Sequence, residues 1–151
     1  MDIDQFLLTA ARYRLDMADA DELIAAATDL ADVPDAPKDL LEISALTPVD
    51  TRREDLQPLV DQVLVSLGAQ RLDDRAAATT VARGVATAIR TEQVEPYDGA
   101  RQLWRLARKV PAVEPLLTGF IHLASEWEDV SDQRAEIDAD IKSEASKLEQ
   151  P

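Results

Sequence analysis

Apolar residues recur at helical spacing along most of the chain, and the pattern is clearest between residues 96 and 129. Two segments, 97–110 and 114–129, each carry one apolar face, and Pro111-Ala112-Val113 separates them. Their apolar positions are Ala100, Leu103, Trp104, Ala107, Val110, Leu116, Leu117, Phe120, Ala124 and Trp127. Because large aromatic residues bury the most area, we expect an antiparallel helical hairpin with Trp104, Phe120 and Trp127 as its buried centre.

The same spacing predicts further helices on both sides of the hairpin. Pro58 lies inside one of them, so that helix either begins at Asp55, with Pro58 in its first turn, or kinks at the proline. The expected ranges are 2–17, about 20–31, 37–46, 51–67, 74–91 and 132–149. With the hairpin, these ranges predict seven to eight helices.

Residues suited to helix ends lie at several of these boundaries. Asp19 or Asp21 can cap the second helix, and Gly68 can end the helix over 51–67. Thr51 and Glu54 have the spacing of a capping box at the start of that helix.

The last helix, over 132–149, differs from the others in the width of its apolar stripe. The stripe contains only Ile137, Ile141, Ala145 and Leu148. We therefore expect this helix to pack loosely, to fray toward Pro151, or to serve a partner.

Composition favours one all-α fold. The chain has 151 residues, of which 46% are hydrophobic, only four are glycine and none is cysteine. This length suits a single compact domain over residues 1–151, organised around the hairpin. Without cysteine there is no disulfide and no thiolate metal site. No apolar run reaches the roughly 20 residues that cross a bilayer, and Asp2 and Asp4 lie where a secretory signal carries positive charge, so we expect a cytoplasmic protein.

Charge is distributed unevenly along the chain. The net charge of −14 divides into −10 for residues 1–66, +3 for 67–113 and −7 for 114–151. One interpretation is internal compensation, in which acidic helices pair with the arginines of the middle segment, such as Arg83, Arg90 and Arg101. The other is an acidic face kept for a basic protein partner. Nucleic acid is disfavoured, because phosphate binding requires cationic contacts.

Charged and aromatic residues are also expected to meet at one end of the hairpin. Arg101, early in the first helix, comes level with Glu126 and Glu128, late in the second, when the helices run antiparallel. The predicted clasp consists of Tyr97, Arg101, Trp104, Glu126, Trp127 and Glu128. Arginine–carboxylate pairs there could be bidentate, and Gly99 would let another segment approach closely.

The sequence offers little for catalysis. There is no phosphate-binding glycine loop, and nucleophilic catalysis would have to use His122, the only histidine, with Ser125 and Glu126. His122 and Glu126 at i, i+4 could begin a metal site, but a solvated histidine–glutamate pair on a helix explains the same spacing. We therefore expect no cofactor and no metal site.

Two motifs of the hairpin resemble those of a family of small, acidic, uncharacterised actinobacterial proteins. They are Pro96-Tyr97-Asp98-Gly99-Ala100-Arg101, followed by Trp104, and Ala124-Ser125-Glu126-Trp127-Glu128-Asp129. The stretch from Asp4-Gln5-Phe6-Leu7 to Tyr13-Arg14 is similar too. The family often has a second aromatic beside Trp104, where this chain has Leu103 and Arg105. The resemblance implies an all-helical domain and no mechanism.

These observations favour a non-catalytic binding protein. Its most concrete form is an inhibitor or immunity-type protein that masks a basic surface with its acidic face, because complementary charge speeds association and selects partners. The residues expected to form that face are Asp16, Asp19, Asp21, Glu22, Asp29 and Asp32. The alternative is a self-associating helical adaptor, which would be a homo-oligomer. An enzyme that uses His122 and Glu126 ranks third.

Overall fold

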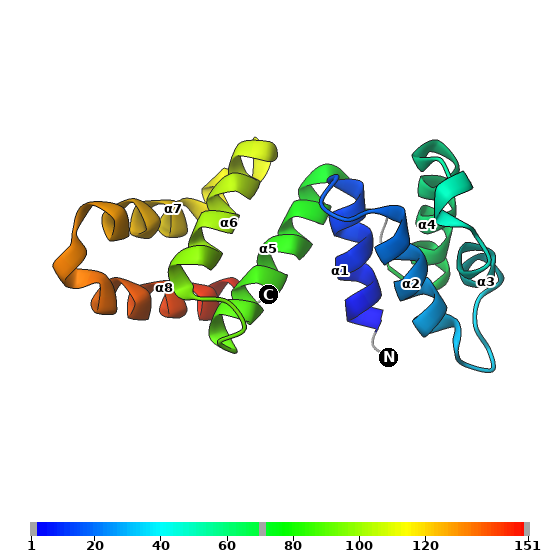
Figure 1. Ribbon diagram of the computed structural model, residues 1–151, viewed down its shortest axis with the longest axis horizontal. Helices are drawn as coiled ribbons and strands as arrows, with labels where there is room; N and C mark the ends of the chain where they lie inside the picture. The colour runs from blue at the N-terminus through cyan, green and yellow to red at the C-terminus, as the bar shows by residue number, and fades with distance from the viewer. Residues whose placement is uncertain (1–2, 70–71, 150–151) are drawn as a thin grey trace. The chain divides into compact units, whose positions relative to one another are not determined.

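All regular secondary structure in the described part of the chain is helical, as the sequence predicts. The computed structural model describes residues 3–69 and 72–149 (Figure 1). Its helices are α1 (Ile3–Arg14), α2 (Ala20–Ala31), α3 (Lys38–Ser44), η1 (Pro48–Asp50), α4 (Arg53–Ser66), α5 (Asp74–Arg90), α6 (Pro96–Lys109), η2 (Pro111–Val113), α7 (Glu114–Asp129), η3 (Ser131–Gln133) and α8 (Arg134–Glu149). The predicted helix start at Asp2 and the fraying predicted toward Pro151 lie outside the described residues.

The chain forms two compact units, residues 1–77 and 78–151, and the division falls within α5. The single domain predicted over residues 1–151 stays a prediction. None of the described helices is both long enough and apolar enough to cross a membrane.

The N-terminal unit has its own hydrophobic core, built by α1 to α4. Each of these helices packs against the next one in the chain (Figure 1). Fully buried side chains include Phe6 from α1, Leu23 from α2, Ile43 from α3 and Leu64 from α4. Because this cluster includes no residue of the hairpin, the hairpin is the centre of only one of the two units.

Two of the helix caps predicted in the N-terminal unit form, and the predicted capping box does not. The Asp19 carboxylate caps α2 by accepting a hydrogen bond from the Glu22 N–H at 2.9 Å. Gly68 has φ +76° and ends α4 in the left-handed turn typical of glycine. The predicted capping box is wrong, because the Thr51 hydroxyl donates instead to the Thr47 carbonyl and α4 begins at Arg53. Pro58 therefore lies in the second turn of α4.

In the C-terminal unit, α6, η2 and α7 form the predicted hairpin, and α8 packs against both of its long helices (Figure 1). The described range of α7, Glu114–Asp129, is the predicted one. The narrow stripe of α8 is buried along its whole length, so α8 is not loosely attached. Four medium-sized apolar residues are enough, because α8 contacts two helices at once.

The centre of the hairpin is mainly aliphatic rather than aromatic. Phe120 is 1% exposed and the leucines Leu103 and Leu117 are fully buried, whereas Trp104 and Trp127 are only half-buried. The predicted centre of Trp104, Phe120 and Trp127 is therefore wrong for both tryptophans. The two tryptophans lie at the edges of their apolar faces, where a large ring is partly covered by its neighbours.

Candidate partner-binding surface

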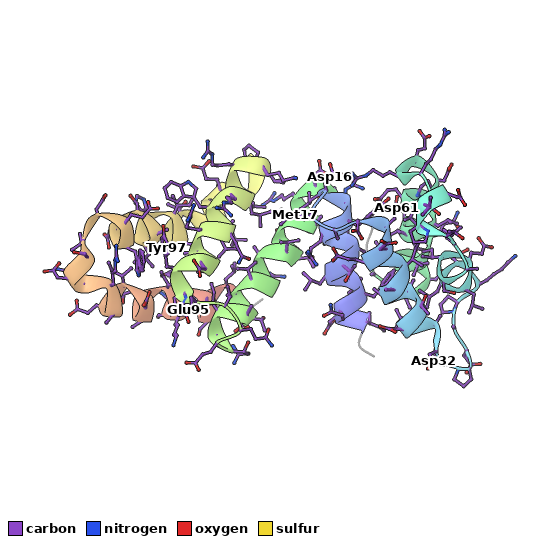
Figure 2. All side chains as sticks on the ribbon, in the orientation of Figure 1. Asp16, Met17, Asp32, Asp61, Glu95 and Tyr97 are labelled. Atoms are coloured by element: carbon purple, nitrogen blue, oxygen red, sulfur yellow. The ribbon has the colours of Figure 1, made fainter. Side chains whose placement is uncertain are left out.

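The six acidic residues singled out from the sequence surround α2. Figure 2 places Asp16 and Asp32 at opposite ends of this helix. On its inner side, Leu23, Ala27 and Leu30 are buried in the core of the N-terminal unit. Because these residues fix the rotation of α2, its carboxylates point outward, and all six predicted residues are exposed.

Three of the six already have partners inside the N-terminal unit. Asp19 caps α2, and the Glu22 carboxylate pairs with the Arg12 guanidinium at 3.1 Å. Asp16 pairs with Arg53 and occupies the left-handed turn that ends α1, with φ 59°. Part of the acidity around α2 is thus compensated by nearby arginines of the same unit. Of the middle-segment arginines that we named, Arg90 pairs with Glu149 of the acidic C-terminal segment, and none pairs with these six residues.

The remaining three, Asp21, Asp29 and Asp32, form no hydrogen bond or ion pair within the described residues. Their spacing of eight and three residues places them along one side of α2 over about 16 Å. Ala25 and Thr28 lie between them and are also exposed. This side of α2 therefore combines unpaired carboxylates with small side chains that leave the helix backbone accessible.

An open groove of about 650 Å³ runs beside this face, between α2 and α3. It is lined by Thr28, Asp29, Ala31, Asp32, Leu41 and Ser44. The Thr28 and Ser44 hydroxyls donate back to their own helices, to the Ile24 and Leu41 carbonyls, so the available polar groups are the two carboxylates. We call Asp21, Asp29, Asp32 and Leu41, with this groove, the acidic groove.

Leu41 is a residue of this candidate surface that sequence reasoning missed. Its neighbours Leu40 and Ile43 are fully buried, whereas Leu41 is 49% exposed at the edge of the groove. Residue 41 of a helix points about 100° away from residue 40, so a helix with Leu40 and Ile43 on its inner side directs residue 41 away from the core. The exposure of Leu41 could therefore have been predicted from the sequence. An exposed leucine between two unpaired aspartates gives the groove both an apolar and an anionic element.

A larger groove, of about 710 Å³, lies beside α4 in the same unit and is a weaker candidate. Several of its polar groups already have partners. Arg14 pairs with Asp74 at 3.0 Å, and the Gln57 side-chain amide donates to Asp61, which Figure 2 labels, at 3.2 Å. The side-chain oxygen of Gln57, Oε1, is buried without a hydrogen-bond partner. The Gln57 residue as a whole is only partly buried, so this oxygen alone does not mark a ligand site.

The predicted clasp forms at the end of the hairpin, but Tyr97 rather than Arg101 closes it. The Tyr97 and Trp127 rings stack with centroids 3.8 Å apart and planes 8° from parallel. The Tyr97 hydroxyl donates to the Glu128 carboxylate at 2.5 Å, and this bond is the main reason that the pKa of Tyr97 is raised. Arg134 lies 3.8 Å from the Trp127 ring centroid and donates to the Trp127 carbonyl.

The expected salt bridge between Arg101 and Glu126 or Glu128 is wrong. Arg101 lies 5.8 Å from the Tyr97 ring centroid and pairs with no carboxylate of the described residues. The guanidinium lies over the Tyr97 ring, while the tyrosine hydroxyl donates to Glu128. Trp104 takes no part in the stack, and Glu126 is exposed without a partner in the described residues.

The histidine considered for catalysis lies on the surface. His122 and Glu126 are exposed on α7, and neither residue lines the two grooves above. In residues 3–69 and 72–149 no three His, Cys, Asp or Glu side chains gather in a group that could hold a metal ion.

Comparison of the chain with protein-family models, with curated proteins and with solved structures finds no match. The resemblance of the two hairpin motifs to an actinobacterial family therefore stays a prediction.

Proposed function

We propose that this chain is a non-catalytic binding protein whose acidic groove takes a cationic, partly apolar segment of a partner protein. The observation that supports this most strongly is that two unpaired carboxylates, Asp29 and Asp32, line the groove together with the exposed Leu41, while the unpaired Asp21 lies further along the same side of α2. An inhibitor or immunity-type protein, which masks a basic surface of its target, is the class of protein that this chemistry suits.

The groove matches a lysine or arginine side chain in two respects. The Asp29 and Asp32 carboxylates can accept hydrogen bonds from the cationic head, and Leu41 can pack against the hydrocarbon stem or an apolar neighbour. The net charge of −10 over residues 1–66 would also attract a basic partner from a distance and speed the encounter. Such steering weakens with salt, because the Debye length falls from about 10 Å at 0.1 M to about 3 Å at 1 M.

The test removes charge from the groove while it keeps side-chain shape. We would measure binding of a fluorescent synthetic peptide of alternating arginine and leucine to the wild type and to the triple variant Asp21→Asn, Asp29→Asn, Asp32→Asn. An exposed ion pair contributes about 0.2–1 kcal/mol, so losing three should weaken binding by roughly 3-fold to 100-fold. A matched control, Asp132→Asn, Glu136→Gln, Asp140→Asn, removes three exposed charges of the C-terminal unit and should change the affinity by less than about 3-fold.

Two further measurements separate a groove from a diffuse charge effect. Leu41→Ser should weaken peptide binding at high salt as well as at low salt, because it removes an apolar contact. Circular dichroism melts of every variant should match the wild type, since the altered side chains are exposed. Equal losses of affinity in the groove triple and the control triple would refute the proposal and leave net charge as the only determinant. A pull-down with the wild type and the groove triple from the native host would then identify the partner.

A further inference from the structure

Helix α6 carries a basic surface, in contrast to the acidic surface of α2. Arg101, Arg105 and Arg108 recur at i, i+4 and i+7 on its exposed side, and the half-buried Trp104 lies beside them. Within the described residues, the Arg105 and Arg108 side chains make no hydrogen bond or ion pair, and Arg101 interacts with Tyr97 but pairs with no carboxylate. We call Arg101, Trp104, Arg105 and Arg108 the basic face.

An unpaired row of arginines is unexpected in a chain with 30 acidic and 16 basic residues. Many other cations of the chain do find carboxylates; Arg12, Arg14 and Arg90, for example, pair with Glu22, Asp74 and Glu149. On α6 the buried residues Leu103, Leu106 and Ala107 fix the helix rotation and hold the arginines away from the core. Arginine and tryptophan are also the residue types that contribute most to protein–protein interfaces.

We propose that the basic face of α6 docks on the acidic groove of a second copy of this chain. Charge complementarity supports this choice of occupant, because the acidic groove offers three unpaired carboxylates and the basic face three arginines without carboxylate partners. The row of arginines, whose seven-residue spacing spans about 10 Å, also fits within the roughly 16 Å from Asp21 to Asp32. Ala25 and Thr28, which are small, let the Trp104 ring and the α6 helix approach α2 closely.

This contact joins two different surfaces, so each copy has one surface of each kind to offer. It rests on the proposed function, because it uses the same acidic groove. A second copy would then compete with a cationic partner, and self-association would hold the groove closed until that partner arrives. With a net charge of −14 on each copy, long-range repulsion opposes the contact, so we expect association only at high protein concentration.

Sedimentation velocity of the full chain at increasing protein concentration tests the inference. The weight-average mass of the wild type should rise above 16.6 kDa with concentration at 0.1 M salt, and this rise should shrink at 1 M salt. One variant, Arg105→Glu with Arg108→Glu, keeps the groove and loses the basic face. A second, Asp29→Lys with Asp32→Lys, keeps the basic face and loses the groove. Each variant on its own should self-associate with an affinity at least 10-fold lower than that of the wild type.

The decisive arm mixes these two variants, because one supplies an intact groove and the other an intact basic face. The mixture should form a 1:1 dimer of near wild-type affinity. A single chain carrying all four charge reversals should self-associate again, since its two surfaces are complementary once more. Asp132→Lys with Asp140→Lys, on exposed positions of the C-terminal unit, is the matched control and should behave like the wild type.

Three outcomes would overturn the inference: a wild type that stays monomeric at millimolar concentration, a mixture that stays monomeric, or variants that still associate alone. A monomeric wild type that binds the arginine–leucine peptide would refute only self-association, and the basic face would then be left for an acidic partner of another kind. The opposite result is also possible: the chain self-associates as described, but the groove triple variant and its control triple bind the peptide equally well. That result would refute only the proposed function.

Discussion

Gly99 in the first turn of α6 is the point at which the packing of the C-terminal unit has least room. A methyl group built there would lie 2.4 Å from Cγ1 and 2.6 Å from Cδ1 of Ile89 on α5, and 3.3 Å from Cγ1 of Val94. Ile89 is fully buried, so it cannot rotate its side chain into solvent to make space. We therefore predict that Gly99→Ala destabilises the protein, although alanine is the better helix former.

Two opposing effects decide the size of this loss. Alanine in place of glycine favours a helix by up to about 1 kcal/mol. Forcing an extra carbon into a well-packed core costs about 1–3 kcal/mol, and both Ile89 contacts are shorter than real carbon–carbon contacts allow. The upper part of that range applies, which gives a net loss of about 1–2 kcal/mol in the free energy of unfolding.

Urea unfolding followed by circular dichroism measures this loss, and a second background isolates its cause. Ile89→Ala alone should cost about 2–5 kcal/mol, because it leaves a cavity. In that background Gly99→Ala should be neutral or stabilising, since the two Ile89 atoms that it would meet most closely are gone and only the longer contact with Val94, at 3.3 Å, opposes the helix preference. If Gly99→Ala had the same effect in both backgrounds, or stabilised the wild type, the steric explanation would be wrong.

Three further predictions concern single residues of each unit. Gly68→Ala should lower the free energy of unfolding by about 1 kcal/mol in the same urea titration, because φ +76° strains any residue with a Cβ although no atom lies within 4 Å; Gly68→Asn should lose less. The hydrogen bond to Glu128 raises the pKa of Tyr97 in the folded state. The protonated Tyr97 therefore stabilises the fold at pH values below its unfolded pKa of about 10, and this stabilisation is lost as pH rises through its folded pKa. Tyr97→Phe should remove this part of the alkaline loss of stability in melts recorded at several pH values. The Thr87 hydroxyl lowers the pKa of Glu149 in the folded state. Ionised Glu149 therefore stabilises the fold above its unfolded pKa of about 4.3, and this stabilisation is lost as pH falls through its folded pKa. Glu149→Gln should make the melting temperature depend less on pH on the acid side.

Helices were predictable here because the apolar period and the proline boundaries agree. The α7 helix matches its predicted range at both ends, where Pro111 to Val113 precede it and Ser131 follows soon after its end. Asp19 and Gly68 were predicted as cap residues on chemistry alone, since few other residue types satisfy the unpaired groups of a helix end.

Other helix ends carry no such signal. Glu92 ends α5 with φ 60°, and its N–H and that of Gln93 bond back to the Ile89 and Ala88 carbonyls, as in a glycine-capped helix. Nothing in the local sequence marks a glutamate for this conformation. Tertiary contacts compensate, because the Glu92 carboxylate pairs with Lys142 of α8 at 3.1 Å.

The hairpin was predictable as an element, but the roles of its aromatic residues were not. Helical periodicity tells which side of α7 faces inward, and Phe120 and Trp127 both satisfy it. It does not tell which of them lies at the middle of that side and which at its edge. Trp127 is at the edge because Tyr97 and Arg134, from α6 and α8, meet its ring there.

Which carboxylates are free was the least predictable property, and it decides how the acidic groove must be tested. Asp16 pairs with Arg53, 37 positions away in the sequence, while Asp29 has no partner in the described residues, and nothing in the sequence near either residue shows this difference. Neutralising all six predicted residues together would remove the Asp19 cap, at a cost of about 0.5–2 kcal/mol, and two ion pairs as well. A fall in melting temperature would then accompany any loss of binding, whatever the role of the surface. Because Leu23, Ala27 and Leu30 anchor the inner side of α2, the unpaired aspartates on its outer side can be changed without touching the core, and an effect of those three on association belongs to the surface itself.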